Sequence, residues 1–279
     1  MATDADPAGG LLTDEEAERL VATAELDVVG AMADASNATL YTRLTVAGKA
    51  CGAAIYKPVT GEQPLWDFPP HTLHLREVAT YRLARFAGLD VVPPTVLREG
   101  PFGPGSVQLW VGPPPEQARE QGGGVVDVCP PEEVPPGWKV VLRARDRRSS
   151  VVLCHADDPR LQQMALLDVL ANNADRKGGH VIDRGDGRLA GVDHGLTFNV
   201  EHKLRTVLWG WAGQPVPSEL VQAADRVCQG LAGELGEQLG PLLDGDELEA
   251  LHERAVDLVR TGVFPGPQGR APAIPWPAF

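Results

Sequence analysis

The sequence predicts an α+β protein with two lobes, a β-rich N-terminal lobe and a mainly helical C-terminal lobe. Three observations predict this fold class. Apolar residues alternate with period two in residues 25–57 and 91–111, they recur at helical spacing after residue 155, and a Pro/Gly-rich stretch separates these regions. The chain divides accordingly into a disordered N-terminus (1–13), an N-lobe (14–112), a connector or insertion (113–137), a C-lobe (138–264) and a Pro-rich tail (265–279).

Composition narrows the class of function. The 279 residues carry a net charge of −13, which argues against general nucleic-acid binding and against unaided docking on an anionic membrane. No apolar run approaches the roughly 20 residues that span a bilayer, and the N-terminal residues lack the features of a signal peptide. The four cysteines are scattered without a CxxC pair. We therefore expect a cytoplasmic protein with reduced thiols, no nucleic-acid partner and no integral membrane association.

The N-lobe is expected to begin with a helix. Thr13 precedes three acidic residues, a pattern typical of a helix N-terminus. Three strands should follow, and the turn between the first two, residues 30–38, contains small and polar residues. Taken alone, this turn is best interpreted as a plain hairpin. If it covers a nucleotide, backbone N–H groups near Asn37 and the hydroxyl of Ser36 would hold the phosphates. The expected strands are 25–30, 39–46 and 51–57.

Lys57 ends the third strand, between Tyr56 and Pro58. It is one of only five lysines, and a compact ammonium at this place can neutralise nucleotide phosphates if a carboxylate holds it. Glu77, within the amphipathic helix expected over residues 74–86, is the available carboxylate. The simpler interpretations are a solvated strand end for Lys57 and a weak surface ion pair for Glu77.

The rest of the N-lobe should supply a hinge. Strands are expected near residues 91–97 and 106–111, and the backbone of Gln108, Trp110 and Val111 would meet an adenine edge, although Trp110 fits a core position better than a base-stacking one. Beyond the connector, Arg143, Arg145, Arg147 and Arg148 form a basic cluster that is either a solvated face or a dock for an anionic substrate. Helices are expected over 155–170, 218–229 and 244–261.

The stretch 166–198 carries the chemistry. An apolar helical run leads into a polar loop that contains Asp175, a hairpin follows, and the stretch closes on Asp193, His194 and Gly195. Two acidic side chains are thus delivered to neighbouring places, one from a loop and one from a strand end. Phosphoryl transfer needs such a pair: one carboxylate accepts the proton of a hydroxyl, and the other holds Mg²⁺ on the phosphates.

Four groups of residues together resemble the phosphatidylinositol 3- and 4-kinase catalytic family and, behind it, the protein-kinase-like fold. The groups are Tyr56-Lys57-Pro58, Glu77 followed by Val91–Thr95, Asp168 with Asn173–Arg176, and Asp193–Gly195. The likeness covers roughly residues 28–260 and is nearest to type II phosphatidylinositol 4-kinases and uncharacterised bacterial proteins of that family.

The resemblance implies residue roles. Lys57 looks like the phosphate-binding lysine with Glu77 as its partner, Asp175 like the catalytic base and Asp193 like the metal-holding aspartate, while Asp168 and Arg176 would brace the loop. The expected site therefore has catalytic residues Asp175, Arg176 and Asp168, nucleotide-binding residues Lys57, Glu77, Ser36, Asn37, Gln108, Trp110 and Val111, and metal ligands Asp193 and His180.

One position departs from the family. Asparagine usually stands five residues after the catalytic aspartate, and here that residue is His180. An imidazole is a softer ligand than an amide oxygen and suits Mn²⁺ better than Mg²⁺. The leading expectation is an ATP-dependent kinase that uses Mg²⁺ or Mn²⁺ and an unidentified hydroxyl acceptor, whether protein, small molecule or lipid. The alternatives are an inactive nucleotide-binding pseudokinase module, an AMP-transferase on the same fold, and a metal-dependent hydrolase using His180, Asp193 and His194.

Overall fold

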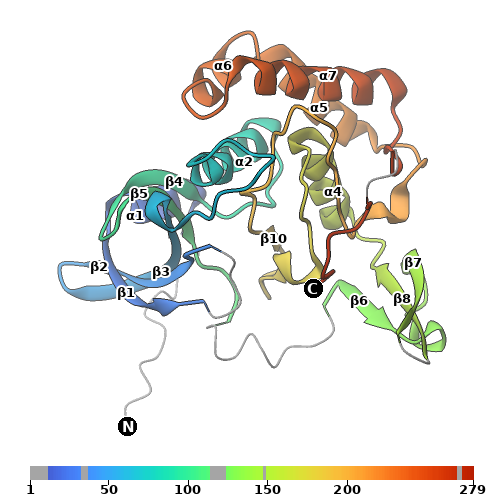
Figure 1. Ribbon diagram of the computed structural model, residues 1–279, viewed down its shortest axis with the longest axis horizontal. Helices are drawn as coiled ribbons and strands as arrows, with labels where there is room; N and C mark the ends of the chain where they lie inside the picture. Colours follow the sequence, from blue (N-terminus) through green and yellow to red (C-terminus); the bar gives the residue numbers. More distant parts are fainter. Residues whose placement is uncertain (1–11, 33–36, 114–123, 147–148, 269–271) are drawn as a thin grey trace.

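The computed structural model describes residues 12–32, 37–113, 124–146, 149–268 and 272–279. Its N-terminal part is a five-stranded antiparallel sheet of order β1-β2-β3-β5-β4, curled around helix α1 (Figure 1). Thr13 caps α1 through a reciprocal capping box with Glu16, as its sequence predicts. The elements are α1 (Asp14–Thr23), β1 (Glu25–Ala31), β2 (Leu40–Val46), β3 (Lys49–Pro58), α2 (Leu73–Ala87), β4 (Thr95–Gly100) and β5 (Gly103–Leu109).

A small apolar core lies between the sheet and α1. Val21 of α1 meets Leu44, Tyr56 and Val107 from the three central strands, and all four side chains are fully buried. In β2 and β3 buried residues alternate with more exposed ones, and this alternation is the pattern from which the strands were predicted. Lys57 lies next to Tyr56 and therefore points to the other face of the sheet, toward the second lobe.

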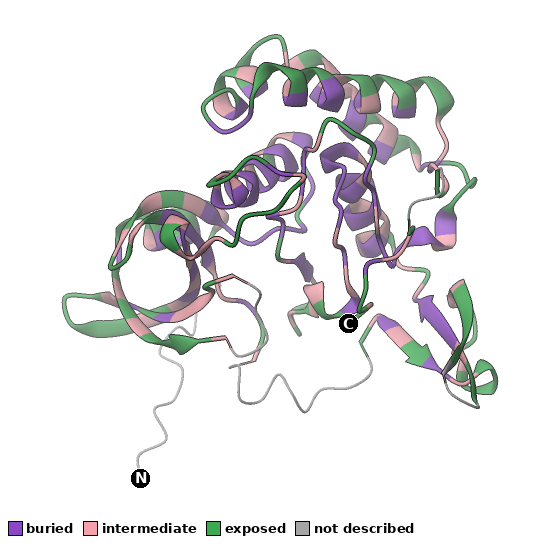
Figure 2. Ribbon diagram, viewed as in Figure 1, coloured by how far each residue is buried: buried purple, intermediate pink, exposed green. Residues whose placement is uncertain are grey.

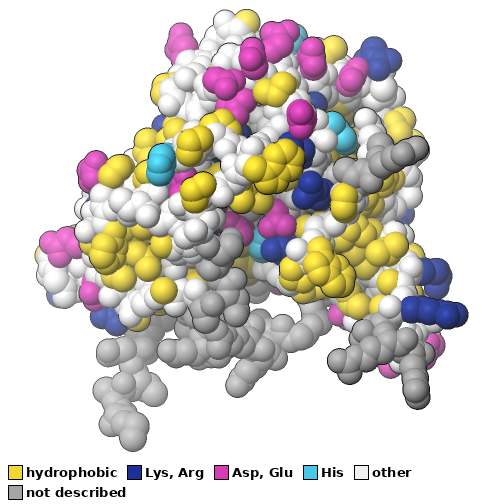
Figure 3. Space-filling view, viewed as in Figure 1, with side chains coloured by type: hydrophobic (Ala, Val, Ile, Leu, Met, Phe, Trp, Pro, Cys, Tyr) yellow, Lys and Arg dark blue, Asp and Glu magenta, His cyan; other side chains and the backbone are white. Residues whose placement is uncertain are grey.

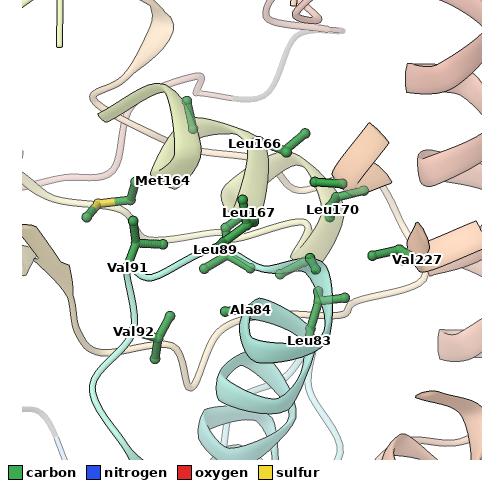
Figure 4. Close-up of a cluster of buried hydrophobic side chains, with 14 of the residues drawn as sticks. Leu83, Ala84, Leu89, Val91, Val92, Met164, Leu166, Leu167, Leu170 and Val227 are labelled. Atoms are coloured by element: carbon green, nitrogen blue, oxygen red, sulfur yellow. The ribbon is translucent and has the colours of Figure 1, made fainter. Parts of the chain in front are cut away.

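The C-terminal part is helical and is built around α4 (Pro159–Ala171). Helix α4 is buried along most of its length, with Leu166, Leu167 and Leu170 fully enclosed, so its sequence is apolar rather than strongly amphipathic (Figures 2 and 4). Val227 of α5 and Leu83 of α2 pack into the same core (Figure 4). The remaining helices are α5 (Ser218–Gly230), α6 (Glu234–Leu239) and α7 (Gly245–Thr261). No described helix is both long and apolar enough to cross a membrane.

Helix α2 joins the two lobes. It packs on β4 and β5 and also on α5 and α6. A buried ion pair joins Arg76 of α2 to Glu247 of α7, and Arg76 also donates to the carbonyl of Thr197 over 2.5 Å. Arg82 donates to the carbonyl of Gln238 over 2.6 Å. These bonds attach α2 to the helical lobe, so the helix contacts both lobes.

A second sheet of order β6-β8-β7 differs from the sequence prediction in two places. Strand β6 (Val126–Cys129) lies inside residues 113–137, which the sequence predicted to be a connector without a compact element. Strand β8 (Ser149–His155) occupies the start of the helix predicted from residue 155, and α4 begins only at Pro159, because Asp158 caps it and proline favours the first helical position. The third strand is β7 (Lys139–Asp146).

The predicted hairpin and the last residues lie near each other. Strands β9 (Val181–Asp183) and β10 (Leu189–Gly191) pair antiparallel as expected. The C-terminal segment, residues 272–279, runs back along the helical lobe and ends beside this hairpin (Figure 1). Its Ala273 carbonyl accepts hydrogen bonds from Thr206 N–H and Trp209 Nε1–H, and its Ala278 carbonyl accepts one from Gly178 N–H over 2.7 Å. The predicted α+β class with two lobes is thus confirmed.

Candidate active site

Lys57 lies at the junction of the lobes, near the end of β3. Its ammonium binds the carboxylate of Glu77 and donates to Asp193 Oδ1 over 2.7 Å. Burial alone would lower the pKa of Lys57, but the charges of Asp193 and Glu77 outweigh it and hold that pKa above its usual value. The pairing of Lys57 with Glu77 expected from sequence is therefore present, and Asp193 is an additional partner.

Glu77 connects the lysine to the segment of Asp193. Its Oε2 accepts a hydrogen bond from the backbone N–H of His194 over 2.9 Å, while Oε1 receives the Lys57 ammonium. The side chain is buried and lies on α2, next to Arg76, whose ion pair anchors the helix to α7. The helix thus fixes the position of Glu77 relative to both lobes.

Asp193 has a strained backbone and an accessible carboxylate. Its φ is 60°, in the left-handed region that non-glycine residues rarely adopt, and its side chain is 49% exposed. Strain of this kind is typical of functional positions. The positive charge of Lys57 lowers the pKa of Asp193, so the carboxylate stays ionised across the ordinary pH range.

Three potential metal ligands converge beside Lys57. Donor atoms of Asp175, His180 and Asp193 all lie within 4.8 Å of one another, and His180 Nε2 is 3.4 Å from Asp193 Oδ2. Burial lowers the pKa of His180 to about 4, so its imidazole is neutral near pH 7 and has a lone pair to offer. Its Nδ1 is buried and has no hydrogen-bond partner among the described residues. Two carboxylates and a neutral imidazole suit a divalent cation such as Mn²⁺.

Two contacts within its own loop position Asp175. Its backbone N–H donates to Asn173 Oδ1 over 3.0 Å, and its carboxylate is 3.2 Å from the ammonium of Lys177. Burial raises the pKa of Asp175 above its usual value, and Lys177 and Arg205 lower it in part. A carboxylate with a raised pKa is a better proton acceptor. Figure 3 shows acidic, basic and histidine side chains close together near the middle of one face of the molecule.

Asp168 and Arg176 lie behind this site, not in it. Both are fully buried, and the Arg176 guanidinium donates to both oxygens of Asp168. Asp168 also accepts from Asn173 Nδ2 over 2.9 Å and from Thr206 Oγ1 over 3.1 Å. Arg176 reaches the carbonyl of Val192 over 3.1 Å. The two buried residues therefore brace the loop through hydrogen bonds and do not line its open side.

Several predicted nucleotide-binding residues are placed differently. Ser36 lies outside the described residues, and Asn37 Oδ1 accepts the backbone N–H of Gln63 over 2.7 Å. Gln108 was expected in a hinge, but it belongs to β5, which is paired on both sides, and its side chain donates to Thr95 Oγ1. The ladder continues to Trp110, whose N–H donates to the carbonyl of Ala53.

The residues that could contact an adenine edge therefore begin further along the chain than Gln108, where the hinge was predicted to start. The ring of Trp110 lies edge-on to Tyr41, with centroids 5.2 Å apart, and its Nε1 donates to the carbonyl of Pro113. This packing agrees with a core role for Trp110. Val111 is buried, so of the predicted hinge only the backbone of Val111 and Gly112 remains a candidate for the adenine edge.

The predicted basic cluster lies away from the candidate site, whereas three residues that were not predicted lie beside it. Arg143 and Arg145 are exposed on β7, far from the five-stranded sheet in Figure 1, and residues 147–148 lie outside the described part. Lys177, Arg205 and Phe279 also lie at the loop of Asp175, and none of them was predicted as a site residue. Lys177 follows Asp175 by two residues in an extended loop, and this spacing was the available signal. Arg205 and Phe279 lie beside the loop through contacts between residues that are distant in sequence.

Comparison with solved structures identifies the fold. A crystal structure of the Golgi casein kinase with Mn/ADP bound matches with a TM-score of 0.53 and 15% identity, covering 89% of this chain and 76% of that chain. Another crystal structure of the Golgi casein kinase also gives 0.53, at 14% identity and with 90% and 75% covered. These matches show a protein-kinase-like fold. These matches do not test the finer resemblance to phosphatidylinositol kinases, which stays a prediction.

Comparison with sequences identifies the family. No family model matches the chain. Protein Rv2133c of Mycobacterium tuberculosis is 47% identical over 272 residues, which cover 96% of this chain and 97% of that protein. At this identity and coverage two chains share one fold throughout. The chain, a protein with a kinase-like fold and a cluster of Lys57, Glu77, Asp193, His180 and Asp175 between its lobes, belongs to the family of protein Rv2133c.

Proposed function

We propose that the protein is an ATP-dependent phosphotransferase, which moves the γ-phosphoryl group of ATP to a hydroxyl acceptor. One observation carries the proposal: Lys57, Glu77 and Asp193 form a connected charge cluster, and donor atoms of Asp175 and His180 lie within 4.8 Å of those of Asp193. Phosphoryl transfer depends mostly on positioning and on charge neutralisation, and this cluster supplies both.

Lys57 would bind the nucleotide phosphates. Its ammonium has three N–H donors and now binds two carboxylates, Glu77 and Asp193. Glu77 is fixed by α2 and by the N–H of His194, so it would keep Lys57 in place while the other donors turn to phosphate oxygens. The Golgi casein kinase structure with Mn/ADP supports a nucleotide and a divalent metal as ligands of this fold.

Asp193 and His180 would hold the divalent cation. Both offer donor atoms, because Asp193 is ionised and His180 is neutral. When bound, the cation supplies positive charge that balances the phosphate oxygens. The donor set contains a nitrogen, which favours Mn²⁺ over Mg²⁺ relative to a site made only of oxygens.

Asp175 would act as the base. The acceptor oxygen attacks the γ-phosphorus and forms a new O–P bond, the bond from the γ-phosphorus to the bridging oxygen breaks, and ADP leaves with that electron pair. The proton of the acceptor hydroxyl passes to the Asp175 carboxylate, whose pKa is raised by burial. Lys177, 3.2 Å from Asp175, is placed to balance charge on the transferred group.

The test uses purified protein and γ-labelled ATP with Mn²⁺ or Mg²⁺. We expect label transfer, to water or to an added acceptor, that Asp175→Asn reduces by at least about 10²-fold while nucleotide binding persists. The control Asp257→Asn changes an acid that is 71% exposed on α7 and should leave turnover unchanged. Equal turnover by Asp175→Asn contradicts the assignment of the base.

The same experiment separates the alternatives. Transfer of label from α-labelled ATP, rather than from γ-labelled ATP, would mean that AMP is transferred. A thermal shift with ATP and Mn²⁺ but no turnover with either label would favour a regulatory module that binds nucleotide without catalysis. Neither outcome would alter the fold, which the structural comparisons establish.

A further inference from the structure

A short parallel pairing places Arg205 beside Asp175. The backbone N–H of Arg176 donates to the carbonyl of Arg205, and the N–H of Val207 donates to the carbonyl of Arg176, each over 3.1 Å. Arg176 is thus the bridge partner of Thr206. In a parallel pairing the preceding residues are also neighbours, so Asp175 lies next to Arg205. The N–H of Arg205 also donates to the carbonyl of Asn173 over 2.9 Å, which ties Arg205 to the same loop although it does not continue the parallel register.

The side chains of this pairing divide between two faces. Arg176 and Thr206 both turn inward and bind Asp168. Because extended residues alternate, their neighbours Asp175, Lys177 and Arg205 turn the other way, toward the open side of the loop. The effect of Arg205 on the pKa of Asp175 agrees with this proximity. Two cations therefore flank the carboxylate that accepts the proton in the proposed reaction.

Arg205 differs from other arginines near the site because part of its guanidinium lacks a partner. Its Nε is buried and makes no hydrogen bond with any described residue. No ion pair within 4.0 Å joins it to a described carboxylate, and Asp175 is paired with Lys177 instead. Arg176, by contrast, gives its donors to Asp168 and Val192. A buried donor without a partner is costly, and an anionic ligand would satisfy it.

We propose that Arg205, with Lys177 beside it, binds an anionic group of the acceptor. The acceptor is then a hydroxyl compound that already carries a phosphate or carboxylate group, and Arg205 presents its hydroxyl to Asp175. This inference rests on the proposed phosphotransferase function. It assigns the acceptor side to the loop of Asp175 and not to the basic strand β7, on which Arg143 and Arg145 lie.

The first test measures anion binding without catalysis. Isothermal titration calorimetry with inorganic phosphate should show binding that Arg205→Gln weakens at least about tenfold, because a hydrogen bond to a charged group is lost. Arg205→Lys, which keeps the charge, should weaken it less. Lys57→Met should remove only phosphate that binds at the nucleotide side and should leave the Arg205-dependent binding in place. Arg260→Gln, at an exposed site on α7, is the control. Melting temperatures verify that each variant is folded.

The second test uses matched acceptors with γ-labelled ATP. Glycerol 3-phosphate should be preferred to glycerol, and glucose 6-phosphate to glucose, by about tenfold or more in kcat/KM. Arg205→Gln should abolish this preference by raising the KM for the anionic acceptor, without raising the KM for ATP. Vesicles with and without phosphatidylinositol distinguish a lipid headgroup from a free phosphate ester as the source of the anion.

The outcomes separate the inference from the proposed function. Phosphate binding that fails in the wild-type protein, that survives Arg205→Gln, or that falls only in Arg143→Gln with Arg145→Gln, overturns the inference. Transfer that is indifferent to acceptor charge does the same and leaves the phosphotransferase function intact. Phosphate binding that depends on Arg205, in a protein that never turns over ATP, supports the anion site and refutes the proposed function.

Discussion

Two clusters of charged residues lie within the same stretch of chain and behave in opposite ways. Around Asp168 every carboxylate oxygen has a partner, from Arg176, Asn173 or Thr206, and water is excluded. Around Asp193 the carboxylate is 49% exposed and its neighbour His180 has a ring nitrogen without a partner among the described residues. Both clusters contain an aspartate and a cation, so residue type alone does not separate them.

The difference shows which of the two clusters has groups free to bind a ligand. In the closed cluster around Asp168 the carboxylate bonds are made to other residues of the chain, so this cluster contributes the shape of the loop. The open cluster keeps donors and acceptors that can turn to a ligand. The two predictions with the largest expected effects test this distinction between a bracing cluster and a reacting one, and two smaller ones concern contacts outside both clusters.

The largest effect is expected at Asp193. Asp193→Asn should lower phosphoryl transfer by about 10³-fold or more, because the charge that would hold the cation is worth several kcal/mol in the transition state. The folded protein should be nearly as stable as the wild type, since the carboxylate is half exposed and its backbone is unchanged. Label-transfer kinetics and urea denaturation give the two numbers. A variant that lost its fold together with its activity would place Asp193 in the bracing class.

Asp168 should respond in the opposite way. Asp168→Leu leaves the buried guanidinium of Arg176 without its partner and should cost about 3–5 kcal/mol in the free energy of unfolding. The same substitution at Asp193 is the matched control and should change stability much less. The comparison fails if the two leucine variants unfold at the same urea concentration.

A smaller effect is expected where the C-terminal segment touches the loop. A methyl group at Gly178 would lie 2.2 Å from the ring of Phe279, whereas one at Gly179 meets nothing within 4 Å. Gly178→Ala should therefore cost about 1–3 kcal/mol in stability and slow transfer, and Gly179→Ala should cost less. Adding Phe279→Ala should relieve part of the Gly178→Ala defect. Equal costs for the two alanines, measured by urea denaturation, would show that Phe279 does not constrain the loop.

The smallest effect concerns a buried histidine outside both clusters. Burial lowers the pKa of His155, while Asp157 raises it and Lys139 lowers it. Its Nε2 accepts the N–H of Gly210 over 3.1 Å, and its Nδ1 lies 2.8 Å from the carbonyl of Ala156, so the neutral ring is the bonded form.

The unfolded chain takes up this proton as pH falls below about 6.5, and the folded chain does so only at lower pH. Stability contributed by His155 is therefore complete above that pH and is lost below it, by at most about 1.4 kcal/mol per pH unit. His155→Gln should flatten the pH dependence of the urea midpoint between about pH 5 and pH 7. An unchanged slope would mean that other groups, such as His180 and His194 near Asp193, carry the whole effect.

Much of the fold and four residues of the candidate site could be predicted from local sequence patterns. Helix α7 combines a capping residue, Asp244, with regular apolar spacing and a glycine C-cap, and its predicted limits hold. Lys57, Asp175 and Asp193 each occupy the end of an element or a polar loop after an apolar run, and Glu77 is the one acidic residue of an amphipathic helix, which made all four recognisable in the sequence. What the structure adds is that their side chains do meet.

The residues that escaped prediction depend on distant pairing. Strand β6 has only four residues and lies in a Pro/Gly-rich region, so it forms because β8 offers a partner. Arg205 acquires its place by pairing with residues some thirty positions earlier, and Phe279 by packing on Gly178. Gln108 was assigned to a hinge because the sequence does not mark where β5 stops. Local periodicity contains no information on such contacts.

The docking of the C-terminal segment has a consequence for how the protein is made. Ala278 and Phe279 complete the support of a loop whose own residues, around Gly178, leave the ribosome about a hundred positions earlier. Domains form from the N-terminus during synthesis, at about 5–20 residues per second, and contacts between distant residues form late. The five-stranded sheet can therefore fold while translation continues, but the loop of Asp175 reaches its final support only after residue 279 has emerged. The cluster of Asp175, His180 and Asp193 is therefore completed after the five-stranded sheet, so a nascent chain can have its first lobe folded before this cluster is fully supported.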